Sequence, residues 1–182
     1  MNLPVIQDPC LVTVDMQERL VPAMTESEEL VARVKILLQG AAELKIPVIA
    51  TEQYPKGLGP TLPEIAELFP EETPVPAKTS FSVFGEPEFR RALERRRPHS
   101  LIFCGIETHV CVLQSLFDAI EAGFPVILAA DAVSSRKSSD VCLALEAARQ
   151  AGAWVLSTES ILFLLLKNSL HPSFKAVSKL IK

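Results

Sequence analysis

The chain has few of the residues that nucleotide-binding loops require. Only seven glycines occur among 182 residues, and no GxGxxG or GxxxxGK segment follows any of the strand-like runs described below. Such loops need glycine so that the backbone can approach a phosphate closely. We therefore do not expect a nucleotide-dependent oxidoreductase or a kinase.

Long hydrophobic runs and a strong charge are also missing. The longest apolar run, 161–166, is far too short to cross a bilayer, and the first nine residues hold two prolines and an acid where a secretory signal needs a basic segment and an apolar core. The formal net charge of -4 gives no general attraction to nucleic acid. Arginines at 90–91 and 95–97 close a predicted helix, and we interpret them as a solvated helix end. Neither a membrane nor a nucleic acid is an expected partner.

The cysteines do not form a paired framework. The four are Cys10, Cys104, Cys111 and Cys142. None belongs to a CxxC pair, and three lie in apolar runs, as ordinary core thiols do. We therefore expect a reducing, cytoplasmic setting.

Apolar runs alternate with segments of helical periodicity along the chain. Strands are expected at 10–15, 48–51, 75–78, 101–104, 125–131 and 153–157, and helices at 27–45, 87–97, 108–122 and 140–151. A long excursion rich in proline and glycine, 52–74, contains one short helix at 64–69, and loops of this length usually serve a site. Parallel strands need crossovers, and the crossovers cover the sheet. The predicted fold class is therefore α/β, a three-layer doubly wound arrangement of a six-stranded parallel sheet with helices on both faces, in a single domain spanning 1–182.

Three chemically active side chains lie at or just beyond the ends of predicted strands. Asp15 ends the first strand, Lys78 ends the third, and Cys111 follows the fourth. Ligands of open parallel sheets bind at the carboxyl ends of the strands, in the crevice where the strand order reverses. If the order is 3-2-1-4-5-6, this crevice places Asp15 beside Cys111, and Lys78 reaches in with its long side chain. A base, a cation and a thiol can together cleave an acyl bond, although Asp15 alone could cap the next segment and Lys78 alone could be a surface lysine.

Cys111 lies about one turn into the helix predicted to start near Thr108, a plausible N-cap. The apolar stripe expected to face the sheet consists of Val110, Leu113, Phe117 and Ile120. A helix N-terminus favours thiolate, and with a nearby cation it can lower a thiol pKa from about 8.5 into the range of about 3.5–7.5. The alternative is that Cys111 is a small core residue, because free cysteine is often buried.

Four segments carry a resemblance to a known family. They are LVTVDMQ (11–17), KTSFS (78–82), GIETHVC (105–111) and DAVSSR (131–136). With these segments the chain resembles the isochorismatase-like cysteine hydrolases, which include nicotinamidases and N-carbamoylsarcosine amidase. The resemblance implies that Asp15, Lys78 and Cys111 form a catalytic triad. It also implies a cis peptide between Ile106 and Glu107, and an oxyanion hole formed by the N–H groups of Glu107 and Cys111.

The chain departs from the nicotinamidases after the second strand. Those enzymes bind a metal there through an Asp-x-His segment and further histidines, whereas this chain has TEQYP at 51–55. Its three histidines, His99, His109 and His171, lie elsewhere, so the resemblance implies no metal site of that type, no cofactor and a substrate other than nicotinamide. We interpret His109 as structural or solvent-facing. The segment 51–59 is similar to the metal-free branch called isochorismatase domain-containing proteins.

The favoured hypothesis is a metal-independent cysteine hydrolase that cleaves a small amide or related C–N bond through a thioacyl intermediate. Two alternatives stay open: a non-catalytic small-molecule-binding or scaffold protein that retains the fold, and vinyl ether hydrolysis of the isochorismatase type. Gln53, Tyr54, Phe81 and Phe84 are candidates for the wall of a small-molecule pocket. Aromatic residues after a strand can also simply pack.

The run 161–166 is apolar on every side, which a helix packed against one sheet face does not require. A second subunit could cover the remaining surface, and on this basis we expect a homo-oligomer. Alternatively, the tail 171–182 folds back over this run.

Overall fold

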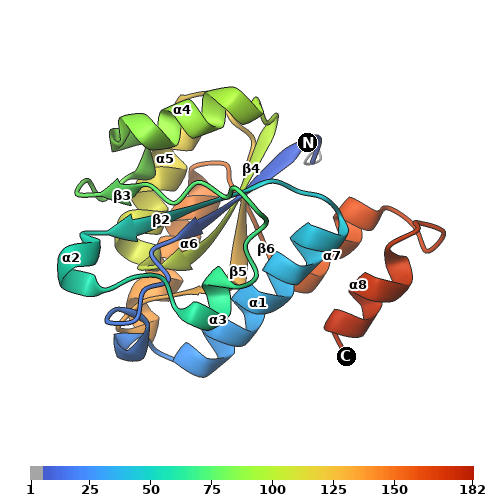
Figure 1. Cartoon of the computed structure of the whole chain (residues 1–182), viewed down its shortest axis with the longest axis horizontal. Helices are drawn as coiled ribbons and strands as arrows, with labels where there is room; N and C mark the ends of the chain where they lie inside the picture. Colours follow the sequence, from blue (N-terminus) through green and yellow to red (C-terminus); the bar gives the residue numbers. More distant parts are fainter. Residues whose placement is uncertain (1–5) are drawn as a thin grey trace.

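The computed structural model describes residues 6–182, so Pro4 of the N-terminal segment lies outside the described residues. Six parallel strands form one sheet in the order β3-β2-β1-β4-β5-β6 (Figure 1). They are β1 (Pro9–Val14), β2 (Val48–Gln53), β3 (Ala77–Lys78), β4 (Ser100–Ile106), β5 (Val126–Ser134) and β6 (Trp154–Leu156). The predicted α/β class with a six-stranded parallel sheet is confirmed, and the strand order is the one assumed above for the crevice beside β1 and β4.

Helices cover both faces of the sheet, which gives the three predicted layers (Figure 1). They are α1 (Ser27–Glu43), α2 (Pro55–Leu58), α3 (Pro63–Ala66), α4 (Pro87–Arg96), α5 (Leu113–Glu121), α6 (Ser138–Gln150), α7 (Thr158–Leu166) and α8 (Phe174–Leu180). Side chains of α1, α3, α7 and α8 pack on one face, and those of α4, α5 and α6 pack on the other. Short 3₁₀ turns lie at η1 (Val21–Ala23) and η2 (Val83–Gly85).

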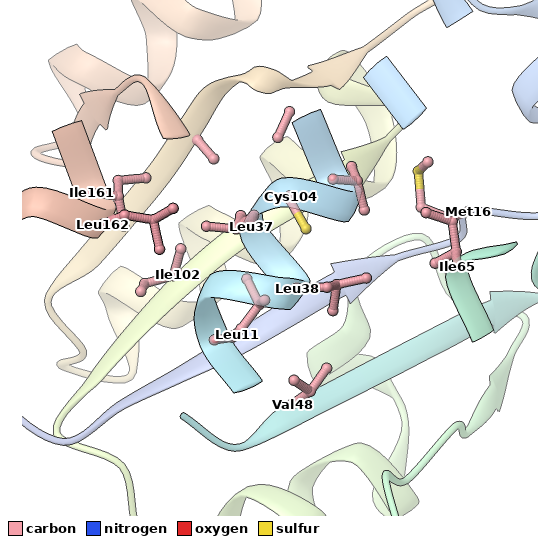
Figure 2. Close-up of a cluster of buried hydrophobic side chains, with 14 of the residues drawn as sticks. Leu11, Met16, Leu37, Leu38, Val48, Ile65, Ile102, Cys104, Ile161 and Leu162 are labelled. Carbon is pink, nitrogen blue, oxygen red and sulfur yellow. The ribbon is translucent and has the colours of Figure 1, made fainter. Parts of the chain in front are cut away.

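Successive residues of the central strands enter opposite cores, because side chains alternate along a strand. In β4, Ile102 lies in the core beneath α1, whereas Phe103 lies in the core on the other face. Figure 2 shows Leu37 and Leu38 of α1 over Leu11 of β1 and the neighbouring strands. Each fully buried side chain of this size stabilises the fold by about 1.5–3 kcal/mol. Burial on both faces explains why the strands form continuous apolar runs.

The apolar run in α7 is covered partly by the tail of the chain. Ile161 and Leu162 are fully buried beside α1, and the Phe163 ring lies 6.2 Å from the Phe174 ring of α8 in an edge-on contact. Leu164 remains 46% exposed. The tail thus covers this run only in part. Among the described residues, none of the helices has the length and apolar character that a transmembrane span requires.

The segment after β4 differs from the predicted regular helix. It begins with a π-helical turn, η3 (Thr108–Val112), and only then continues as α5. The Thr108 hydroxyl caps no backbone group and has no hydrogen-bond partner within residues 6–182. The predicted apolar stripe is wrong for Phe117, which is 41% exposed. The buried positions are instead Val112, Ser115, Leu116 and Ala119. A π turn inserts one residue into the helix, and this rotates the face that follows.

Candidate active site

The carboxyl ends of β1, β2, β3 and β4 lie at one rim of the sheet (Figure 1). Val14, at the end of β1, is paired with Thr51 on one side and Gly105 on the other. Gly105 has a φ of +109°, and a Cβ there would lie 2.1 Å from the Val14 carbonyl oxygen. Only glycine therefore allows the two strands to approach so closely, and this approach brings Asp15 next to the turn that carries Cys111.

Asp15 is almost completely buried, at 1% exposure. Its Oδ1 accepts a hydrogen bond of 2.8 Å from the Thr51 hydroxyl, and its Oδ2 lies 2.8 Å from the Lys78 Nζ. Burial raises the pKa of Asp15, while the charge of Lys78 and the hydrogen bonds from Lys78 and Thr51 lower it without reversing the direction. Asp15 is thus a carboxylate held by a cation, with an increased affinity for a proton.

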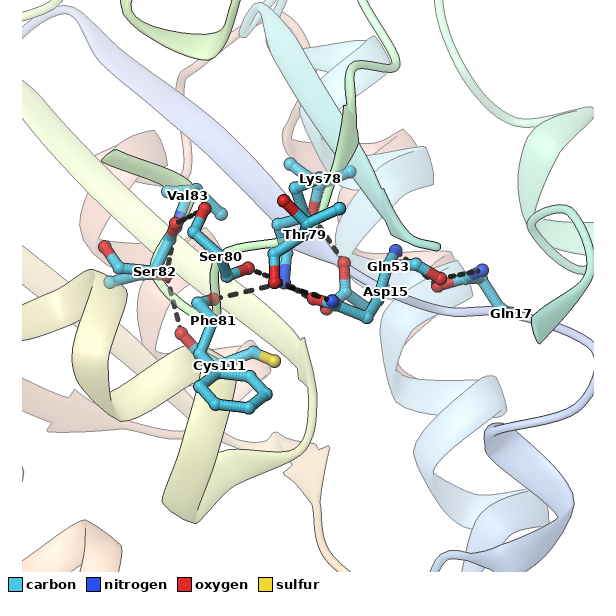
Figure 3. A network of polar contacts seen from close by, with 12 residues as sticks. Asp15, Gln17, Gln53, Lys78, Thr79, Ser80, Phe81, Ser82, Val83 and Cys111 are labelled. Carbon is cyan, nitrogen blue, oxygen red and sulfur yellow. Dashed lines mark hydrogen bonds and ion pairs between the residues drawn. The ribbon is translucent and has the colours of Figure 1, made fainter. Parts of the chain in front are cut away.

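The Lys78 ammonium group contacts four oxygen atoms of the described residues, and the Asp15 carboxylate supplies one of them (Figure 3). Besides Asp15, the acceptors are the side-chain oxygen of Gln53 at 2.5 Å and the carbonyl oxygens of Ser80 and Phe81 at 3.2 and 3.1 Å. The Lys78 side chain has no exposed surface. A protonated amine has only three N–H donors, so these acceptors saturate it. Lys78 is therefore a buried side chain with its donors engaged, and is no surface lysine.

The Cys111 thiol lies in the same place, and it is 7% exposed. Asp15 and Lys78 are close enough to shift its pKa by charge and by direct polar contact. Burial and the negative charge of Asp15 raise the pKa of Cys111 to about 11, and Lys78 offsets only part of this. The expected lowering of this pKa is therefore wrong, because desolvation and the carboxylate outweigh the lysine. In the free protein Cys111 is a thiol.

The turn between β4 and η3 carries the predicted unusual peptide bond. The bond between Ile106 and Glu107 is cis. The N–H group of Glu107 donates to no acceptor in the described part of the chain, while the Glu107 side chain pairs with Arg136 at 2.8 Å. Cys111 lies within the π turn itself, where backbone N–H groups are incompletely paired, as in any first helical turn.

The loop from Thr79 to Gly85 is tied to both sides of the site. Glu86 Oε1 accepts hydrogen bonds from the N–H groups of Thr79 and Ser80 and from the Ser80 hydroxyl, and the Ser80 hydroxyl is the largest cause of a lowered Glu86 pKa. On the other side, the buried Ser115 hydroxyl accepts from the Val83 N–H at 2.9 Å and donates to the Cys111 carbonyl at 2.6 Å. Sequence reasoning missed both Glu86 and Ser115. The i, i+4 spacing of Cys111 and Ser115 was the only sequence signal for the latter.

The four predicted pocket residues occupy different environments. Tyr54 and Phe81 are 56% and 54% exposed. Both contact Lys78 through their backbones: the Tyr54 N–H donates to the Lys78 carbonyl, and the Phe81 carbonyl accepts from the Lys78 amine. Phe84 packs instead against Phe89 and Phe124, with ring centroids 5.3 and 6.4 Å apart, so the packing alternative describes it. Gln53 turns its amide oxygen towards Lys78 (Figure 3).

His109 contacts residues of the loop after β5 and of α6. Its Nδ1 lies 2.9 Å from the Ser135 hydroxyl, and its Nε2 lies 3.9 Å from Asp140. These contacts connect η3 to the loop after β5 and to α6. Within residues 6–182, no group of three or more histidine, cysteine or acidic side chains is arranged to hold a metal ion.

Comparisons with known proteins identify the family of the chain. Residues 9–160 match the family described as Isochorismatase domain. The chain is 41% identical over 172 residues to isochorismatase domain-containing protein 2 of Danio rerio, a match that covers 94% of this chain and 85% of the relative.

Two solved structures have the same fold. The MAR1 ribonuclease of Caenorhabditis elegans superposes with a TM-score of 0.90 at 40% identity, covering 95% of this chain and 88% of that one. The YcaC gene product of Escherichia coli, described as an octameric hydrolase of unknown specificity, superposes with a TM-score of 0.93, covering 100% of this chain and 91% of that one. Its identity is 24%, so this likeness concerns the fold.

Proposed function

The chain belongs to the isochorismatase domain family, and from this premise we propose that it is a metal-independent cysteine hydrolase of small amides or related C–N bonds. Cys111 is the nucleophile, Asp15 the base and Lys78 the electrostatic support. The observation that carries the proposal is the buried Asp15–Lys78 ion pair, 2.8 Å long, in contact with the Cys111 thiol. Buried charges are costly to maintain, and their convergence on a thiol is typical of a reactive site.

The reaction starts from a thiol and a carboxylate. As the Cys111 sulfur forms a bond to the substrate carbonyl carbon, Asp15 accepts the thiol proton; its raised pKa suits this role. The protonated Asp15 then gives that proton to the departing nitrogen as the C–N bond breaks, which leaves a thioacyl group on Cys111. A water molecule next attacks the thioacyl carbon while Asp15 accepts its proton. The acid leaves, and the proton returns to the Cys111 sulfur.

Charge develops on the substrate oxygen in both steps. The N–H groups of Glu107 and Cys111 are the proposed donors to this oxyanion. The Glu107 N–H meets no acceptor within residues 6–182, which supports the assignment. Removing one such donor elsewhere has cost on the order of 10²–10³ in rate. Lys78 makes no bond to the substrate in this scheme, because its N–H groups are already engaged.

The wall of the substrate site is proposed to include the exposed rings of Tyr54 and Phe81. Aromatic rims favour a small substrate with an apolar portion. The charges of Asp15 and Lys78 cancel, so the site offers no net charge to attract an ionic substrate.

Metal independence is proposed from the donors at the end of β2. Gln53 offers an amide oxygen that Lys78 already occupies. Tyr54 and Pro55 follow, and neither supplies the carboxylate or imidazole groups that zinc and iron prefer. These residues do not fit a nicotinamidase-type metal site.

Hydrolysis of RNA is the second candidate, because the 40% identical C. elegans protein is described as a ribonuclease. We favour amide hydrolysis, since Lys78 is saturated by oxygen acceptors and cannot also stabilise a phosphate. Vinyl ether hydrolysis and binding without turnover remain the further alternatives, and they predict no covalent adduct on Cys111.

The test is to incubate the protein with a library of small amides, quench it in acid and search for acylated Cys111 by peptide mass spectrometry. Cys142→Ser, which removes the exposed cysteine, is the matched control for Cys111→Ser. We expect an adduct and release of the amine in the control and in the wild type, but not in Cys111→Ser. Cleavage of RNA, or amide turnover that survives Cys111→Ser, would contradict the proposal.

We also propose that the chain forms a homo-oligomer. Leu164 of α7 and Leu170 just beyond it are 46% and 90% exposed, and a second subunit would remove them from water. The related YcaC is described as octameric. Light scattering of the purified protein should give a multiple of 19.9 kDa, and a monomeric mass at micromolar concentration would contradict this.

A further inference from the structure

Gln53, at the end of β2, makes two side-chain contacts that join the parts of the site. Its Oε1 accepts a 2.5 Å hydrogen bond from the Lys78 ammonium, and its Nε2 donates a 3.1 Å hydrogen bond to the Thr79 carbonyl. One amide group therefore hydrogen-bonds both to the Lys78 side chain and to the loop that begins at Thr79 (Figure 3). An amide can do this because it carries an acceptor and donors on one rigid plane.

Gln17 holds the backbone from which this amide projects. It is completely buried, its Oε1 accepts from the Gln53 N–H at 2.7 Å, and its Nε2 donates to the Gln53 carbonyl at 3.0 Å. The same nitrogen also donates to the Gly59 carbonyl at 2.6 Å. Both backbone groups of Gln53 are therefore fixed by one side chain, and this fixes the direction of its amide.

Among the four oxygen acceptors of Lys78, only Asp15 is charged. We propose that Gln53 is a positioning residue, held by Gln17, that fixes the Lys78 ammonium against Asp15 without adding a second negative charge beside Cys111. This inference rests on the proposed cysteine hydrolase mechanism. In that mechanism Asp15 has to be the one carboxylate that takes the thiol proton.

The neutrality of Gln53 has an electrostatic consequence. A carboxylate at the same place would share the ammonium with Asp15 and oppose the formation of a thiolate, because a like charge disfavours the charged form. Three charged or titratable groups surround Lys78 in the described part of the chain. They are Asp15, directly after β1, the Cys111 thiol of η3, and Glu86, directly before α4, whose charge interacts with that of Lys78. Gln53→Glu introduces a negative charge at this contact with Lys78 while almost preserving the shape of the side chain.

The experiment compares the alkylation of Cys111 in Gln53→Glu, Gln53→Met and the wild type, all in a Cys142→Ser background. Cys10 and Cys104 are fully buried with pKa values raised to about 12, so iodoacetamide should report on Cys111. Rates are measured by peptide mass spectrometry from roughly pH 6.5 to roughly pH 9.5, a range in which a thiol of raised pKa is mostly protonated. Gln150→Glu on the exposed end of α6 is the matched control for the same chemical change.

We expect Gln53→Glu to be alkylated about threefold to tenfold more slowly than the wild type at every pH. A rise of about one pKa unit leaves tenfold less thiolate, and the more basic thiolate recovers roughly threefold of this through its greater nucleophilicity. Gln150→Glu should match the wild type. A folded Gln53→Glu variant with the wild-type rate overturns the proposal, because a residue that only supports the scaffold would not move this profile.

Gln53→Met keeps the test decisive if the charged variant does not fold. Lys78 then loses its shortest hydrogen bond, the 2.5 Å contact with the Gln53 oxygen, and keeps two longer ones to backbone carbonyls besides Asp15. The amine is then held less firmly, so its labelling by acetic anhydride should rise severalfold, as measured by mass spectrometry. Labelling at the wild-type level would also overturn the proposal. Neither readout requires turnover, so a wild type that forms no thioacyl adduct refutes the proposed function while leaving the role of Gln53 measurable.

Discussion

The Lys78 ammonium lies 2.8 Å from the Asp15 carboxylate, and the two side chains are 0% and 1% exposed. A pair so well removed from water is costly to form and more costly to break, because the remaining charge is left without a partner. The Cys111 thiol completes the group, and its raised pKa follows from the same burial and from the same carboxylate. The electrostatics of the site therefore depend on this pair.

Replacing Lys78 with methionine should destabilise the fold by about 3–5 kcal/mol near neutral pH, since Asp15 then stays buried and unpaired. The pKa of Asp15, already raised by burial, should rise further. A group whose folded pKa exceeds its unfolded pKa is best tolerated in acid, so the loss should shrink as the pH falls below the folded pKa.

Urea denaturation at several pH values measures this loss. Adding Asp15→Asn to the Lys78→Met variant removes the lone charge and should restore part of the stability. If the double variant is as unstable as the sum of the two single variants, Lys78 and Asp15 are not coupled.

Gly105→Ala should disrupt the junction of β1 and β4. The new Cβ would lie 2.1 Å from the Val14 carbonyl oxygen, and the φ of +109° disfavours any side chain. We expect a loss of at least about 1–3 kcal/mol in the free energy of unfolding. Gly123→Ala is the matched control, because Gly123 also has a positive φ but a Cβ added to it would meet nothing within 4 Å. Equal losses in the two variants would show that steric contact with Val14 is unimportant.

Ser115→Ala tests the hydrogen bonds by which Ser115 of α5 joins Cys111 to the loop that contains Phe81. The buried Val83 N–H loses its acceptor and the Cys111 carbonyl loses a donor, so stability should fall by about 1–3 kcal/mol. Hydrogen exchange at the Val83 amide should accelerate. Ser82→Ala removes the contact with Asp118 and the side-chain acceptor of the Phe84 N–H, but it leaves the Ser115 acceptor in place. The Val83 amide should therefore stay protected in this variant, and equal exchange in both variants would contradict the assignment.

The alternation of apolar runs and helical segments was sufficient to predict the parallel sheet. The meeting of Asp15, Lys78 and Cys111 followed only on the assumption of the strand order that the structure shows. The π turn η3 was not predicted, because a single π turn has no hydrophobic period that could be recognised in the sequence. The residue that it inserts rotates the following helix and leaves Phe117 exposed. The thiol pKa was also predicted in the wrong direction. Helix position can be inferred from sequence, whereas the depth of burial and the distance to a carboxylate depend on the packed structure.

The role of Gln53 was similarly hidden. A glutamine after a strand looks like a residue of the pocket wall, and only the packed geometry shows that its amide oxygen meets Lys78. Side-chain direction at the end of a strand depends on contacts with distant segments, here the backbone clamp made by Gln17.

The central claim is that Asp15 takes the proton of Cys111, and Asp15→Asn tests it most directly. Without the negative charge the pKa of the thiol should fall, so alkylation by iodoacetamide near pH 7 should become faster, by about threefold for each pKa unit, because the tenfold gain in thiolate is partly offset by its lower nucleophilicity. Hydrolysis of the amide that best acylates the wild type should at the same time fall by about 10²-fold or more, because no base remains to carry the proton. Opposite changes in these two rates are the predicted result, and slower alkylation together with undiminished hydrolysis would contradict the account.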